Sequence, residues 1–468
     1  MNKDTMDTNQ KALQINMDAK RYGTFAEIGA GQEVARRFFH VGGAAGTVAK
    51  TISAYDMGIS DAIYGPSDRY VSRKRLQSML DYEFNLLLER LNTQRGDRCA
   101  FFAFADTVAT HSFTRSEEGH GWLGIRFQSE CHKDPCEIII HVRMLDHENV
   151  REQEALGIIG VNLIYGAFYH FKEPEVLIRS LMDDLSRDRI EVDMIKFSGP
   201  SFVGVDNRLM SLQLVQQGLT DAAMFTAEGE VVQPTDVLYK KPVLVERGSF
   251  RPVTNTTLDM LDRATEQFLL EPSVKGEQPV VLMEMTLRNL LSDGGVDHKD
   301  FLQRVDVLRA LGKTVLISNY ARYYKLVAYL SRYTQKGIGL ALGIPSLREI
   351  FDEKFYTDLE GGLLESLGRL FKNSVKLYVY PWRDPVTGKV TMAENLKVAP
   401  HLQNLYAYLI ENKCVESIQK HNVEYLPIFS RDVLARIQTY DPSWETMVPP
   451  PVVEMIKRDN LFGFRELK

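Results

Sequence analysis

The chain has 468 residues, of which 44% are hydrophobic and 25% charged, values typical of an ordinary globular protein. Its formal net charge of -6 argues against the basic footprint of a nucleic-acid-binding protein, although a local basic pocket for a small anion would fit. The start of the sequence has no apolar core of the secretory type, and the most apolar stretch, residues 155–168, is shorter than the roughly 20 residues of a membrane span. Four cysteines form no disulfide framework. We therefore expect a cytoplasmic protein that binds neither nucleic acid nor membrane.

The first fifth of the chain is expected to be a flexible arm followed by a helical region. Residues 1–20 are polar and lack sustained periodicity, which predicts the arm. Apolar residues then recur with helical spacing, and glycines mark the breaks between the periodic stretches. These observations predict a helical N-terminal region over residues 21–95, with helices at 25–39, 47–63 and 72–91.

A glycine-rich stretch from Gly29 to Thr51 lies within this region and invites a phosphate-loop interpretation. No strand is expected before Gly29, however, and Lys50 does not adjoin a glycine. Close packing of helices through small residues is the favoured alternative.

The remainder is expected to be an α/β protein. Residues 96–136 form a β-rich segment, and from 137 to 420 apolar strands alternate with amphipathic helices, which predicts a mostly parallel sheet. An open wound sheet is the preferred fold class, and a closed (β/α)8 barrel is the alternative. Residues 421–468 are expected to be a C-terminal tail that wraps onto the body or onto a neighbouring subunit. The eight strands counted for the barrel are 137–145, 190–197, 221–226, 242–248, 279–286, 314–319, 338–344 and 376–381.

The most specific motif is RGSFRPVTNTTLDMLDRA, which reads as a strand end, a glycine turn and a helix. Backbone N–H groups at such a turn and at the amino end of a helix form an anion site. Positive charge nearby comes from Lys240, Lys241, Arg247 and Arg251. The expected phosphate- or nucleotide-binding residues are Lys241, Arg247, Gly248, Ser249 and Arg251.

This motif resembles the first motif of nicotinate- and nicotinamide-nucleotide adenylyltransferases, in which a Gly-Ser-Phe-x-Pro turn precedes an H-x-G-H or T-x-G-H signature. Gly248, Ser249, Phe250 and Pro252 match the turn, and Thr254 stands at the first signature position; Thr256 and Thr257 replace the glycine and the last histidine. ISNYAR resembles the second motif of that family, with matches at Ile317, Ser318 and Arg322. The resemblance implies nucleotide-phosphate binding with Thr254, Ser318 and Arg322 as catalytic residues. Phrases such as HVGGAAGTVAKTISAYD and VKLYVYP are also similar to an uncharacterised bacterial family of comparable length.

Carboxylates at predicted strand ends suggest a second kind of chemistry. Asp146 and Glu284 each come at the end of a predicted strand, where catalytic or metal-binding side chains gather. If the two converge, they would hold a divalent metal such as Mg²⁺ or act as an acid and a base. The structural alternative is that they cap helices and pair with arginines.

Three weaker features have structural alternatives, which we favour for the first and the third. Cys131, His132 and Cys136 suggest zinc, but a second ligand pair is missing from the neighbourhood, so an unligated loop is preferred. Asp106 lies in an apolar strand, where it is either paired or functional. A run of tyrosines and basic residues from Tyr320 to Arg332 could stack on a base, although core packing predicts the same residues.

Two functional hypotheses follow. The first is an enzyme or binding protein for a small phosphorylated ligand, closest in motif to adenylyl transfer. The second is a non-catalytic ligand sensor or self-assembling homo-oligomer, with subunit contacts made by the glycine-rich helices and the C-terminal tail. Convergence of Asp146, Arg247, Glu284, Ser318 and Arg383 on one pocket would favour the enzyme.

Overall fold

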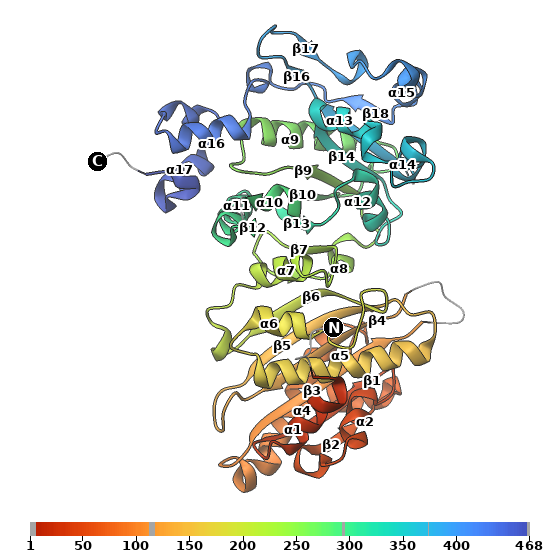
Figure 1. The fold of residues 1–468 in the computed structure, drawn as a ribbon, viewed down its shortest axis with the longest axis vertical. Helices are drawn as coiled ribbons and strands as arrows, with labels where there is room; N and C mark the ends of the chain where they lie inside the picture. Colours follow the sequence, from red (N-terminus) through yellow and green to blue (C-terminus); the bar gives the residue numbers. More distant parts are fainter. Residues whose placement is uncertain (1–5, 112–117, 293–294, 373, 466–468) are drawn as a thin grey trace. The chain divides into compact units, whose positions relative to one another are not determined.

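A computed structural model describes the chain except for residues 1–5, 112–117, 293–294, 373 and 466–468 (Figure 1). The chain divides into two compact units, Met1–Asp221 and Ala222–Lys468. Each unit is built on its own open sheet with helices on both faces, and we describe each by itself. None of the helices in the described residues combines the length and the apolar character that a bilayer crossing requires.

The first unit contains a mixed six-stranded sheet in the order β2-β1-β3-β4-β5-β6. β1 is parallel to both β2 and β3, whereas β3 to β6 run antiparallel in sequence order. The strands are β1 (Arg21–Ile28), β2 (Val48–Ile52), β3 (Ala100–Ala109), β4 (His120–Phe127), β5 (Cys136–Met144) and β6 (Ile190–Ser198). The helices are α1 (Thr8–Met17), α2 (Glu33–His40), α3 (Met57–Tyr64), α4 (Arg73–Arg95), α5 (Asn149–Tyr169), α6 (Pro174–Ser180) and α7 (Asn207–Gln216).

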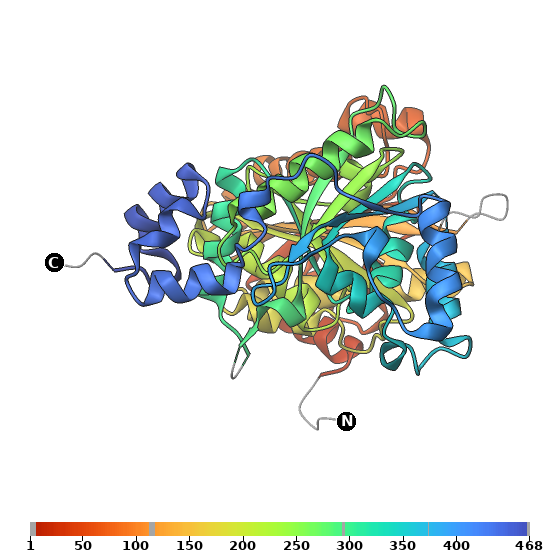
Figure 2. The same cartoon turned by 90° about the horizontal axis from the view of Figure 1, so that it is seen from above.

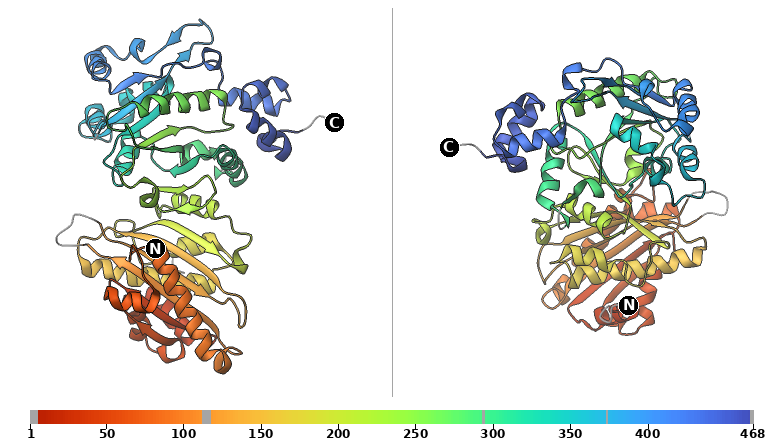
Figure 3. Two further views of the ribbon diagram at one scale, coloured as in Figure 1. Left: turned by 180° about the vertical axis from the view of Figure 1, so that it is seen from behind. Right: turned by 45° about the horizontal axis from the view of Figure 1, so that its top comes forward.

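The two faces of this sheet are covered by different helices. α5 lies across the face seen in Figure 1, and α4 lies across the face seen from behind in Figure 3. α5 is buried along most of its length, because its apolar side chains pack against phenylalanines and isoleucines of the strands. A side chain at Gly124 would meet Leu76 and Leu80 of α4, so glycine lets this helix approach β4 closely.

The expectation of a helical N-terminal region is wrong, because β1 and β2 form strands there. β1 is buried almost throughout, so its sequence, RYGTFAEI, shows no alternation of polar and apolar residues. Gly23 is required in it, since a Cβ atom would lie 2.4 Å from the Phe102 carbonyl oxygen. α4 does form in the last of the three stretches expected to be helical.

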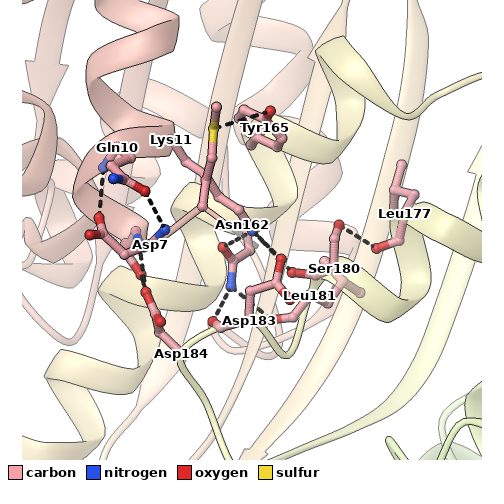
Figure 4. Close-up of polar contacts among 12 residues, drawn as sticks. Asp7, Gln10, Lys11, Asn162, Tyr165, Leu177, Ser180, Leu181, Asp183 and Asp184 are labelled. Atoms are coloured by element: carbon pink, nitrogen blue, oxygen red, sulfur yellow. Dashed lines mark hydrogen bonds and ion pairs between the residues drawn. The ribbon is translucent and has the colours of Figure 1, made fainter. Parts of the chain in front are cut away.

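Within residues 1–20, α1 is bound to the body of the first unit (Figure 4). The Lys11 side chain is 2% exposed, and its Nζ donates to Asn162 Oδ1 at 2.8 Å and to Asp183 Oδ2 at 2.6 Å. Asp184 Oδ2 also accepts from the backbone N–H of Thr8 at 2.6 Å. These buried polar contacts attach α1 to α5 and to the segment that follows α6.

The second unit contains an eight-stranded sheet in the order β18-β15-β14-β9-β10-β13-β7-β8. β7 and β8 are antiparallel additions at one edge, and the other six strands are parallel. The strands are β7 (Ala222–Phe225), β8 (Val231–Val232), β9 (Val243–Arg247), β10 (Val280–Thr286), β13 (Thr314–Ser318), β14 (Ile338–Gly343), β15 (Val375–Tyr380) and β18 (Val415–Ser417). Two small hairpins pair β11 (Leu291–Ser292) with β12 (Gly295–Val296) and β16 (Trp382–Arg383) with β17 (Val390–Thr391).

The helices of this unit cover both faces of the parallel part (Figure 2). α9 packs on β9 and β14 on one face, and the apolar sides of α12 to α15 share one core on the other. The helices are α8 (Pro234–Leu238), α9 (Asn255–Leu269), α10 (Leu287–Leu290), α11 (His298–Ala310), α12 (Tyr323–Leu330), α13 (Ile344–Ile350), α14 (Gly362–Leu370), α15 (Gln403–Glu411), α16 (Ser430–Gln438) and α17 (Pro450–Asp459).

The open wound sheet is found in the second unit, and the barrel alternative is wrong for the described residues, because both sheets have free edges. Two of the eight strands counted toward a barrel, β5 and β6, belong to the first sheet and are antiparallel. Their continuous apolar runs reflect burial on both faces, and burial does not specify strand direction. The division between the units, at Asp221 and Ala222, falls inside the segment 137–420 that the sequence presents as one α/β domain.

Candidate functional site

The order of the parallel strands reverses at the centre of the second sheet. From β9 the chain adds β10 and then β13 on one side, and it returns to add β14, β15 and β18 on the other. Ligands of open α/β sheets bind outside the carboxyl ends of the strands at such a reversal. The carboxyl ends of β9 and β14 are therefore the place where a site is expected.

A pocket of about 280 Å³ lies at this edge. Its lining comes from the ends of β9 and β10, the loop after β13 and the helix after β14. The lining residues are Arg247, Thr286, Arg288, Asn289, Ala321, Arg322, Tyr323, Ser346, Glu349, Ile350 and Tyr356.

Beneath the pocket, Arg247, Glu284 and Ser318 form a buried polar cluster. Arg247 Nε and Nη2 donate to the two carboxylate oxygens of Glu284 at 2.8 and 2.9 Å. Ser318 Oγ donates to Glu284 Oε1 at 2.5 Å, and the Glu284 side chain is 0% exposed. Burial acts to lower the pKa of Arg247, but nearby negative groups, the Glu284 carboxylate first among them, together raise it. The cluster thus neutralises its own charge and fixes Arg247 at the floor of the pocket.

Two other arginines offer positive charge to the pocket. The guanidinium of Arg322 stacks over Phe355 at 4.1 Å and donates through Nε to the Phe355 carbonyl oxygen. Its terminal amino groups make no hydrogen bond or ion pair within the described part of the chain. Arg288 is exposed and is likewise unpaired among the described residues. Both guanidinium groups are therefore available to an anion.

The amino end of α9 is covered by the chain itself. Thr254 is 2% exposed and forms a capping box with Thr257. The first helical N–H, that of Asn255, donates to the Met447 carbonyl oxygen at 2.9 Å, and the Thr256 hydroxyl donates to the carbonyl oxygen of Tyr425. The C-terminal segment, residues 421–465, thus occupies the positions at which the sequence motif would present N–H groups to a phosphate.

The other residues expected to bind phosphate do not line this pocket. In the glycine turn, Ser249 contributes its carbonyl oxygen to Arg304, and Gly248 donates its N–H to the Glu284 carbonyl oxygen at 3.1 Å. Arg251 Nε pairs with Asp300 Oδ1 at 2.6 Å. Lys241 precedes β9 and lies at the amino edge of the sheet, opposite the pocket.

Arg251 lines a second cavity, of about 380 Å³, between α11 and the C-terminal segment. Asp297 and Asp300 also line this cavity, together with Lys299 and Arg465. The two carboxylates offset the cations, so this cavity is less suited to a phosphate than the pocket at the strand ends.

The two expected metal ligands lie in different units. Asp146 follows β5 in the first unit, where Arg189 Nε donates to its Oδ2 at 2.9 Å; Glu284 is bound by Arg247 in the second. Both carboxylates therefore have arginine partners, which is the alternative to a metal or acid–base site that the sequence left open. Across the residues that the structure describes, no group of three or more His, Cys, Asp or Glu side chains is placed to hold a metal ion.

The context of the glycine-rich stretch differs from the expectation, because β1 directly precedes Gly29 and α2 follows. The first turn of α2 is already occupied, since both oxygens of Glu27 accept N–H groups, from Val34 and Ala35 at 3.0 and 2.9 Å. Glu27 therefore fills the position that a phosphate would take.

The other singled-out residues have local partners. His132 contacts Asp97 at 2.8 Å, and Cys136 Sγ accepts from the Ser201 N–H. Asp106 lies opposite Glu27 on neighbouring strands. Tyr320, Tyr324 and Tyr329 are buried in the core, and Arg383, on β16, is not part of the pocket lining.

Several pocket residues were not found from the sequence, above all Arg288, Asn289 and Glu349. Their positions in the sequence could have identified them, since each follows a strand of the parallel sheet by a few residues. Using these positions required the strand order, which the sequence alone does not provide.

No protein-family model matches the sequence, and no curated protein matches it. Solved structures resemble parts of the chain distantly. The competence/damage inducible protein CihA from Agrobacterium tumefaciens is 16% identical with a TM-score of 0.26, covering 34% of this chain and 94% of its own. A competence-damaged protein (CinA) superfamily protein from Klebsiella pneumoniae is 12% identical with a TM-score of 0.27, covering 35% and 96%. Plasmodium falciparum nicotinic acid mononucleotide adenylyltransferase is 12% identical with a TM-score of 0.29, covering 48% and 98%. Scores this low assign no family to the chain.

Proposed function

We propose that the second unit binds a small phosphorylated metabolite, such as a sugar phosphate or a mononucleotide, in the pocket at the carboxyl ends of β9, β10, β13 and β14. The observation that carries the proposal is the pair of unpaired guanidinium groups, those of Arg288 and Arg322, in a pocket at the reversal of strand order. Guanidinium groups bind phosphate with charge-assisted, frequently bidentate hydrogen bonds.

The proposal concerns binding rather than adenylyl transfer. Thr257 stands where the family signature has its last histidine, and its hydroxyl lies 3.1 Å from the Thr254 hydroxyl within the helix cap. Both hydroxyls are thus engaged in the helix cap. A ligand sensor fits these contacts as well as an enzyme does.

Calorimetric titration of the full chain with pyrophosphate, AMP and sugar phosphates tests the proposal. Arg288→Ala should weaken binding about tenfold or more, because a hydrogen bond to a charged group contributes about 1.5–3 kcal/mol. Arg431→Ala is the matched control, since Arg431 is 88% exposed and, among the described residues, pairs only with its neighbour Asp432. Arg247→Ala is unsuitable as a test, because it would leave Glu284 buried without its partner.

Equal loss of binding in the Arg288 and Arg431 variants would contradict the proposal. If none of these phosphorylated compounds binds, the proposal is also contradicted. A bound ligand would be readily detected, because at 100 times its dissociation constant it stabilises the folded state by about 2.7 kcal/mol.

A further inference from the structure

The pocket at the strand ends is lined by one carboxylate, that of Glu349, which makes no ion pair within the described residues. Glu349 lies on α13, which begins directly after β14, and its side chain is exposed in the pocket lining. Within the described residues it makes no ion pair or side-chain hydrogen bond. The nearby Arg247 is already bound to both oxygens of Glu284. Glu349 is therefore free to interact with a ligand.

A free carboxylate in a phosphate pocket restricts the ligand. An ionised carboxylate only accepts hydrogen bonds, and it repels an anion that comes close. A ligand that is anionic throughout would lose affinity through this repulsion. A ligand with phosphate at one end and hydroxyl donors at the other would satisfy the arginines and Glu349 together.

Adjacent hydroxyls on a sugar suit such a carboxylate, because its two oxygens can each accept from one of them. Acidic residues accept hydrogen bonds from ribose hydroxyls at the carboxyl edge of other doubly wound sheets. The cavity volume of about 280 Å³ also lies just below the range of about 300–1,000 Å³ for drug-sized ligands, which favours a small ligand.

We infer that the pocket selects a phosphorylated sugar with two adjacent free hydroxyls, with the phosphate at Arg288 and Arg322 and the hydroxyls at Glu349. This inference rests on the proposed function, and it adds the chemical class of the ligand and a residue that determines specificity.

Ribose 5-phosphate and 2-deoxyribose 5-phosphate differ by one of these hydroxyls and provide the test. Calorimetric titration of the full chain should show about tenfold tighter binding of ribose 5-phosphate. In Glu349→Gln this preference should disappear and inorganic phosphate should bind more tightly, because the repulsive charge is gone. Glu360→Gln, which changes an exposed glutamate outside the pocket, should behave as the unmodified protein does.

Two results would overturn the inference alone: equal binding of the two sugar phosphates, or a preference that persists in Glu349→Gln, each with phosphate binding still dependent on Arg288. If neither sugar phosphate nor inorganic phosphate binds, the proposed function is itself wrong and the inference is wrong with it.

Discussion

Arg247, Glu284 and Ser318 show how a single buried carboxylate organises the floor of the pocket. Both oxygens of Glu284 are hydrogen-bonded, which offsets the cost of burying its charge. Asp146 and Glu284 were both predicted as site residues because they lie at strand ends, but each is paired with its own arginine. Residue type and strand position thus left two possibilities, a metal or acid–base site and pairing with arginines, whereas the partner of each carboxylate depends on the fold.

Glu284→Gln should destabilise the chain strongly, because it leaves the guanidinium of Arg247 buried with a neutral partner. Removing one member of a buried ion pair costs about 3–5 kcal/mol. Urea denaturation of the full chain measures the loss. Glu365→Gln, which breaks the partly exposed pair with Arg369, should cost less than about 1 kcal/mol. Similar losses in the two variants would contradict the assigned role of Glu284.

The Glu27 and Asp106 pair predicts a pH dependence in the first unit. Burial raises the pKa of Glu27 to about 7, with Asp106 as its neighbour on the adjacent strand, and burial raises the pKa of Asp106 well above its usual value. The folded state therefore holds protons that the unfolded state releases between about pH 4.5 and pH 7. Stability from this pair is present at acid pH and is lost as pH rises through the folded pKa.

Asp106→Asn should remove part of this loss, because it takes away one of the two buried charges and keeps an oxygen for the Ile28 N–H. Scanning calorimetry at pH 5 and pH 8 measures the free energy of unfolding of both proteins. At pH 8 the variant should be more stable than the unmodified chain by roughly 1–3 kcal/mol, since a shift of one pKa unit corresponds to about 1.4 kcal/mol. A difference between the two proteins that does not change with pH would rule out this coupling.

At the scale of elements, the sequence predicted the parallel strands of the second unit better than the strands of the first. β9, β10, β13 and β14 fall within the apolar runs expected to be strands, and β15 begins one residue before its run. β1 did not, because Gly23, Thr24 and Glu27 interrupt its apolar character, and each is needed by a specific contact with another element. Such contacts join residues far apart in sequence, so local periodicity does not report them.

α1 depends on one buried lysine, and this leads to a prediction for that element. Lys11→Met should leave Asn162 Oδ1 and the Asp183 carboxylate without their donor and destabilise the first unit by about 3 kcal/mol. Peptides from α1 should then exchange their amide hydrogens faster in mass spectrometry. Lys20→Met, at an exposed lysine three residues after α1, should leave exchange unchanged; loosening of α1 by both substitutions would contradict the role of Lys11.

For the whole molecule, the division into two units limits where a ligand should act. All residues of the pocket belong to Ala222–Lys468. Ribose 5-phosphate at saturation should therefore slow amide exchange in peptides covering 286–289, 321–323 and 346–350, because bound ligand restrains these segments. Protection confined to residues 6–111 or 118–221 would place the ligand in the other unit.

The sequence pointed to the carboxyl edge of the parallel strands without identifying the pocket. It selected Arg247, Ser318 and Arg322, which the structure brings to the carboxyl edge of the parallel strands. It selected Thr254 and Arg251 on a motif whose amino-terminal turn is covered by the C-terminal segment, some 190 residues later in the chain. That covering and the reversal of strand order are both properties of the complete fold.

The presence of a phosphate site at Arg288 and Arg322 is tested most directly by crystals of the full chain soaked in tungstate, a phosphate-shaped anion with a strong anomalous signal. We expect an anomalous peak within hydrogen-bonding distance of these two guanidinium groups, and loss of this peak in Arg288→Ala. Peaks found only elsewhere, for example beside Lys299 and Arg465 in the cavity at α11, would contradict the account.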